Sequence, residues 1–85
     1  MREPGRDKER LQYIVEAADI VIEQSKGMTF EMFTSDKIRY GAIVYYTMII
    51  GEAGYMLSRE FVAKYNTVPW SDIVGMRHHI VHGYY

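Results

Sequence analysis

The sequence predicts an all-α fold, an antiparallel bundle of three helices, from two observations. Apolar residues recur at helical spacing in three segments, and no turn signal of the kind that bounds short strands interrupts them. The breaks between these segments are short, as they are where successive helices run antiparallel. The 85 residues contain no repeat, low-complexity tract or linker, so we expect one small domain over residues 1–85.

The first helix is expected over residues 7–26. Asp7 is a candidate N-cap, and Gly27 is of the residue type that commonly ends a helix. Residues 28–34 are expected to form a loop. The apolar side chains of the helix lie on one stripe, opposite a polar face, and they are Leu11, Ile14, Val15, Ala18, Val21 and Ile22.

The second helix is expected over residues 37–64, after Ser35 and Asp36 as candidate N-caps. Its middle has almost no polar face, which indicates a central helix that is buried on more than one side. β-Branched residues there would also permit a strand, but the apolar run continues without a turn signal, so a helix is preferred. Three glycines in this segment are expected to mark a close approach of another helix or a kink; they are Gly41, Gly51 and Gly54.

The third helix is expected to begin around Pro69 and Trp70 and to end at Gly83. Proline is tolerated in the first turn of a helix, and glycine is a common stop. The apolar side of this helix consists of Trp70, Ile73, Val74 or Met76, Ile80 and Val81.

The composition excludes several classes of protein. The absence of cysteine excludes disulfides and thiolate metal sites. The N-terminus lacks the pattern of a signal peptide, and no uncharged run reaches the roughly 18 residues of a membrane span, so we expect a cytoplasmic protein without a membrane partner. The net charge of −1 argues against extended nucleic-acid binding. Residues 37–85, however, carry five Lys/Arg against three Asp/Glu, which is compatible with a local anion site.

The last nine residues contain an arginine, all three histidines and two tyrosines. Histidine exchanges protons near neutral pH, and arginine presents a fork of donors to phosphate oxygens. Arg77 and His82, with His78 as an auxiliary, are therefore candidates for metal-free phosphodiester cleavage. The alternative is a cationic, aromatic helix end that interacts favourably with the helix dipole. Tyr84 on its own is interpreted as a packing residue.

Arg77 and His82 are five residues apart, which places them about 140° apart around an α-helix. One helix therefore cannot direct both side chains at one atom. Either the helix ends before His82, or a second copy of the chain supplies the complementary group across a two-fold axis. We expect the second arrangement, a composite site in a homodimer or higher oligomer.

A metal site is the competing interpretation of the histidines. His78 and His82 are one turn apart and could chelate zinc if Asp72 or Glu52 came near as a third ligand. No third ligand lies at a recognisable spacing, so the sequence predicts neither a metal nor a cofactor.

Glu52 interrupts a run that is otherwise apolar from Ala42 to Leu57. A buried carboxylate needs a partner, so two roles remain open. Glu52 either lies on an exposed strip or caps a backbone group, or it pairs with Arg77 or a histidine and orients that group.

The pattern Arg77-x4-His82-x-Tyr84 resembles the signature of HepT-like toxins, which belong to the HEPN superfamily of small helical ribonucleases. Further segments are similar to the family in the same order, so that the resemblance covers nearly the whole chain. These segments are Ile49-Ile50-Gly51-Glu52-Ala53, Val68-Pro69-Trp70, Ile73, Gly75-Met76-Arg77 and Ile80-Val81-His82-Gly83-Tyr84.

The resemblance implies an antiparallel helical bundle, dimerisation and metal-independent cleavage of RNA. It also implies a cognate antitoxin, a minimal nucleotidyltransferase that silences the toxin by adding AMP to the motif tyrosine. By position, Arg77 corresponds to the phosphate-binding residue, His82 to the catalytic histidine and Tyr84 to the modified residue. His78 stands where the family commonly has another polar residue.

One departure from the family pattern concerns the C-terminus. Family members continue past the motif into a further helix, whereas this sequence stops at Tyr85. Without that helix we expect exposed apolar surface on the second helix, at a cost of about 25 cal/mol per Å². The alternative to an active toxin is therefore an inactive, truncated bundle that binds a nucleotidyltransferase partner.

Overall fold

The computed structural model describes the backbone of residues 4–83 and the side chains of residues 5–76 and of His78. The described residues form helices and no strand, which confirms the all-α prediction. The elements are the 3₁₀ helix η1 (Pro4–Arg6) and the α-helices α1 (Asp7–Ser25), α2 (Phe30–Ser35), α3 (Lys37–Tyr55), α4 (Arg59–Lys64) and α5 (Trp70–Gly83).

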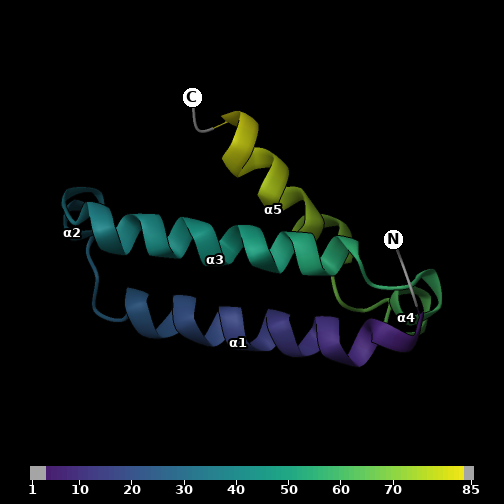
Figure 1. Cartoon of the computed structure of the whole chain (residues 1–85). Coiled ribbons are helices and arrows are strands. Elements are labelled where there is room, and N and C mark those ends of the chain that lie inside the picture. Colours follow the sequence, from purple (N-terminus) through teal and green to yellow (C-terminus); the bar gives the residue numbers. More distant parts are fainter. Residues whose placement is uncertain (1–3, 84–85) are drawn as a thin grey trace.

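The three long helices form the bundle, with α3 in the middle (Figure 1). Helix α1 runs antiparallel to α3 along its whole length, and α5 packs against the C-terminal half of α3 before diverging from it (Figure 1). The prediction that the second helix is central is therefore confirmed. None of the helices in the described part of the chain is long and apolar enough to cross a membrane.

The N-terminus of α1 differs from the prediction. Asp7 is the first residue of α1 and not its N-cap, because Arg6 occupies the cap position without a capping hydrogen bond. The Asp7 carboxylate instead accepts two hydrogen bonds from Ser58, one from the backbone N–H at 2.8 Å and one from the hydroxyl group. At the other end, Gly27 adopts a left-handed φ of 66°, as expected for the residue that stops the helix.

The segment predicted as a loop, residues 28–34, contains most of the short helix α2. This part of the prediction was wrong because six residues are too few for hydrophobic periodicity to show. The helix depends on local capping: the Thr29 hydroxyl accepts a hydrogen bond from the Met32 N–H at 3.1 Å. Asp36 caps α3 in the same way by accepting from the Arg39 N–H at 3.1 Å, which confirms it as an N-cap.

The helix predicted over residues 37–64 is divided into α3 and α4. The backbone turns after Tyr55, and Ser58 caps α4 by accepting a hydrogen bond from the Phe61 N–H at 3.1 Å. Ser58 is only 1% exposed, and its own donors are satisfied by Asp7 on α1. The break was not predicted because it depends on this contact between residues 51 positions apart.

The core lies at the C-terminal half of α3, where α1, α4 and α5 meet, and its buried apolar residues are Ala17, Ile50, Ala53, Leu57 and Trp70. Gly54 marks a close approach of α5, as expected for one of the three glycines. A Cβ atom there would lie 3.4 Å from Ile73 Cγ2 and 3.5 Å from Val74 Cγ2. The N-terminal half of α3 is less covered, since Ile38 is 86% and Tyr45 58% exposed. Exposed apolar surface on this helix was expected.

Candidate functional site

Helix α5 carries the C-terminal motif and is anchored at its first residue. The Trp70 indole N–H donates to the Tyr65 carbonyl at 2.9 Å, and the Trp70 ring packs edge-on against Phe61 of α4 at 5.9 Å. The Ile73 N–H donates to the Pro69 carbonyl at 3.1 Å, so that proline sits at the start of the helix as predicted.

The helix continues through His82 to Gly83. The alternative in which the helix ends before His82 is therefore excluded. Arg77 and His82 lie five residues apart on one regular helix. At about 100° per residue, the two positions diverge by about 140°. His78 is exposed on the same helix. Tyr84 lies outside the described residues, and the side chains of Arg77 and His82 lie outside the described side chains.

Glu52 is exposed on α3, and it lines one cavity together with α5 and another together with α1. A cavity of about 270 Å³ is lined by Glu52, Gly51 and Tyr55 of α3 and by Val74 of α5. Val74 is one turn before His78, so Glu52 stands beside the part of α5 that leads into the motif. The exposure of Glu52 agrees with the predicted position on an exposed strip. Its proximity to α5 is compatible with the other predicted role, in which Glu52 orients Arg77 or a histidine.

On its other side, Glu52 faces α1. A cavity of about 150 Å³ is lined there by Glu52 and by Arg10, Tyr13, Ile49, Ala53 and Met56. The Nε atom of Arg10 is buried and has no hydrogen-bond partner among the described residues. This guanidinium group therefore contributes a positive charge behind Glu52, a feature that the sequence pattern did not indicate.

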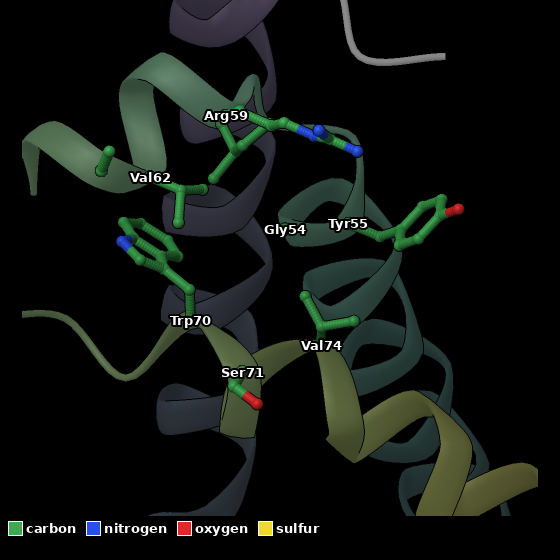
Figure 2. Close-up of a pocket in the computed structure, with 9 residues that line it drawn as sticks. Gly54, Tyr55, Arg59, Val62, Trp70, Ser71 and Val74 are labelled. Carbon is green, nitrogen blue, oxygen red and sulfur yellow. The ribbon is translucent and has the colours of Figure 1, made fainter. Parts of the chain in front are cut away.

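A third cavity, of about 410 Å³, was not indicated by the sequence either. It lies where the end of α3, α4 and the start of α5 meet, with Arg59 and Tyr55 at one side and Trp70 at the other (Figure 2). Ser71 adds a hydroxyl group to the wall. The remaining wall is apolar and is formed by Gly54, Leu57, Val62, Ala63 and Val74.

No group of three or more His, Asp or Glu side chains that could hold a metal ion occurs among the side chains that the structure describes. The pair His78 and His82 is not tested by this finding, because the His82 side chain is not among them.

Comparison with known proteins relates the chain to one family. Residues 10–85 match a family described as Ribonuclease HepT-like. A protein of Caldanaerobacter subterraneus subsp. tengcongensis, named as a candidate RNase, is 40% identical over 75 residues, which are 88% of this chain and 67% of that protein. A second candidate RNase, from Methanocaldococcus jannaschii, is 35% identical over 72 residues, covering 85% of this chain and 66% of the relative.

A third relative, from Thermococcus cleftensis, is named as a candidate ribonuclease HepT and is 31% identical over 78 residues, which are 92% of this chain and 71% of the relative. The chain thus spans about two thirds of the length of the relatives that it matches. No solved structure gives a significant match.

Proposed function

Because the chain belongs to the HepT-like ribonuclease family, we propose that it is a metal-independent endoribonuclease and the toxin of a toxin–antitoxin pair. The observation that carries the proposal is the family match over residues 10–85, which includes the Arg77-x4-His82 motif on α5. Ribonucleases act on RNA, so the substrate that we propose is a ribose phosphodiester.

In the proposed reaction, the RNA 2′-hydroxyl attacks the adjacent phosphorus atom and the 5′-oxygen leaves. His82 removes the 2′-hydroxyl proton or protonates the leaving oxygen, the two roles that histidine most often has in general acid–base catalysis. Arg77 donates hydrogen bonds to the phosphate oxygens and stabilises the charge that develops there. His78 is an auxiliary group, and Glu52 orients one of these side chains from α3.

The divergence of Arg77 and His82 on α5 supports a site shared by two copies of the chain. Each copy would then supply Arg77 to one site and His82 to the other across a two-fold axis. The exposed apolar side chains of α3, among them Ile38 and Tyr45, are compatible with such association.

The first test is cleavage of single-stranded RNA by the purified chain in the presence of EDTA. Wild type is expected to retain its activity, and Arg77→Ala and His82→Ala are each expected to lose at least about 100-fold, the usual contribution of an acid–base group or a charge-stabilising donor. Activity that EDTA abolishes would favour the metal interpretation of His78 and His82. No cleavage at all would favour a bundle that only binds a partner.

The shared site has a sharper test, because the two inactive variants should complement one another. When Arg77→Ala and His82→Ala chains are mixed and exchange subunits, half of the dimers are mixed, and one of the two sites in each is intact. About one quarter of wild-type activity is therefore expected. If both groups act within one chain, the mixture stays as inactive as its components.

The proposed control acts on Tyr84, two residues after His82. A cognate minimal nucleotidyltransferase would transfer AMP from ATP to the Tyr84 hydroxyl, with pyrophosphate as the leaving group. The adduct places a phosphate anion close to the cationic groups needed for RNA. Coexpression is expected to add one or more AMP masses to the peptide that contains Tyr84 and to suppress toxicity. Tyr84→Phe should escape both effects. Full protection of Tyr84→Phe without any adduct would mean that the partner masks the site instead.

A further inference from the structure

The 410 Å³ cavity at the junction of α3, α4 and α5 has the properties of a binding site that the motif does not account for. Its volume lies within the roughly 300–1,000 Å³ of small-ligand pockets. Its floor consists of apolar side chains, including Leu57, Val62 and Val74, and of the Trp70 ring. Such a surface favours a flat, weakly polar group and disfavours a charged one.

The rim of the cavity adds an aromatic ring and a cation. Tyr55 is 50% exposed, and the Arg59 guanidinium extends to the same side of the cavity (Figure 2). Among the described residues, the Arg59 side chain has no ion pair or hydrogen bond. On the opposite wall, the Ser71 hydroxyl can donate or accept a hydrogen bond. An aromatic face beside an arginine matches a nucleobase that is attached to a phosphate.

Helix α5 connects the cavity to the motif. Ser71 and Val74 line the cavity, and His78 lies exposed on the same side of α5, one turn after Val74. The rise of 1.5 Å per residue separates Ser71 from His78 by about 10 Å and from His82 by about 16 Å along the helix axis. A strand held in the cavity can therefore run along α5 to the motif.

We propose that this cavity binds one nucleotide of a single-stranded RNA substrate, with its base between Tyr55 and Trp70 and its phosphate on Arg59. The inference rests on the proposed ribonuclease function and adds a substrate subsite to it. A base that is paired and stacked in a duplex cannot enter the cavity, so the subsite selects single-stranded RNA.

Binding is measured in the His82→Ala background, so that the RNA is not cleaved, by fluorescence anisotropy of a labelled single-stranded oligonucleotide. Arg59→Ala is expected to weaken binding by about fivefold or more and to reduce the slope of log K against log salt by about 0.7, the value for one lost phosphate contact on a single strand. Tyr55→Ala should weaken binding by about tenfold, as expected for the loss of one stacked base. Ala63→Phe, at an exposed position on α4 that lines the cavity, should weaken it by filling the space.

Lys64→Ala is the matched control, because Lys64 is a cation on the same helix but lies over the Tyr65 ring, with Nζ 5.6 Å from the ring centroid. The Lys64→Ala variant should bind the oligonucleotide as tightly as the His82→Ala background does. Circular dichroism identifies any variant that does not fold, and Arg59→Ala, at an exposed position, tests the subsite independently of the cavity-filling variant.

The outcomes separate the subsite from the ribonuclease function. Suppose that the wild-type chain cleaves RNA and that neither Arg59→Ala nor Ala63→Phe changes the KM for RNA. The proposed subsite is then wrong, whereas the proposed ribonuclease function is supported. If the wild type does not cleave but oligonucleotide binding depends on Arg59 and Ala63, the subsite is supported and the nuclease function fails. Duplex RNA bound as tightly as single strands, or AMP bound as tightly as the oligonucleotide, would overturn an RNA-strand site.

Discussion

The contact between Asp7 and Ser58 is expected to make a large contribution to stability for a single polar interaction. It joins the first turn of α1 to the cap of α4, and it satisfies both the backbone N–H and the hydroxyl group of Ser58, a residue that is 1% exposed. Asp7→Ala leaves both donors of Ser58 without their acceptor. The Ser58 hydroxyl is still able to accept from the Phe61 N–H, so the local cap of α4 is retained.

The magnitude follows from the cost of unsatisfied buried groups, about 1–3 kcal/mol each. Two donors lose their partner, but Asp7 is half-buried and water can reach part of the space, so the low end of the range applies, about 1–1.5 kcal/mol for each donor. We expect Asp7→Ala to lower the free energy of unfolding by about 2–3 kcal/mol. A domain of this length has a total stability of about 4–13 kcal/mol, so the variant should remain folded.

Urea unfolding followed by circular dichroism measures the loss. Asp36→Ala is the matched control, because the Asp36 carboxylate also accepts a hydrogen bond from a backbone N–H but is exposed, and its loss should cost about 1 kcal/mol. A double-mutant cycle of Asp7→Ala and Ser58→Ala should give a coupling energy of at least about 1 kcal/mol. If the two substitutions are additive, or if Asp7→Ala changes stability by less than Asp36→Ala, the Asp7–Ser58 contact does not make the contribution expected of it.

Three further predictions concern packing and charge. Gly54→Leu should destabilise the fold, because a Cβ atom at this position would already contact Ile73 and Val74 of α5. Gly41 has open space around it, so Gly41→Leu should stabilise the fold by up to about 1 kcal/mol. Urea unfolding of both variants measures the two effects. Leu57→Ala should cost about 2–5 kcal/mol in the same assay, since Leu57 is 1% exposed. A hydrogen bond from Arg6 lowers the pKa of Glu9 below its ordinary 4.5. The stability that Glu9 adds is therefore present above pH 4.5 and is lost as the pH falls through the lower folded value. NMR titration should show a higher Glu9 midpoint in Arg6→Ala than in the wild type.

The long helices could be predicted from the sequence because their signals are local. The apolar stripe of α1, the Asp36 cap of α3 and the proline before α5 each depend on residues within a few positions of one another. The division between α3 and α4 could not be predicted in this way. The apolar pattern continues across it, and the turn is stabilised by Asp7, 51 residues earlier in the chain.

In the candidate site, too, only the features with a local signal could be predicted from the sequence. The positions of Arg77 and His82 on one helix follow from their spacing, and the roles proposed for them follow from the family signature. The cavity beside Arg59 has no such signal, because its walls come from three helices that only the turn after Tyr55 brings together. In the sequence alone, Arg59 is one charge among several on a predicted helix.

The turn after Tyr55 links the stability of the fold to its proposed substrate site. In an uninterrupted helix, Arg59 would lie about 6 Å beyond Tyr55 along the axis of α3. In the structure, α4 turns back, so that Phe61 packs on Trp70 and Val62 and Ala63 line the cavity. Since Asp7 holds Ser58 at this turn, loss of the contact loosens α4 and with it the cavity wall. Asp7→Ala should therefore weaken binding of single-stranded RNA even where the chain remains folded, although Asp7 itself does not line the cavity.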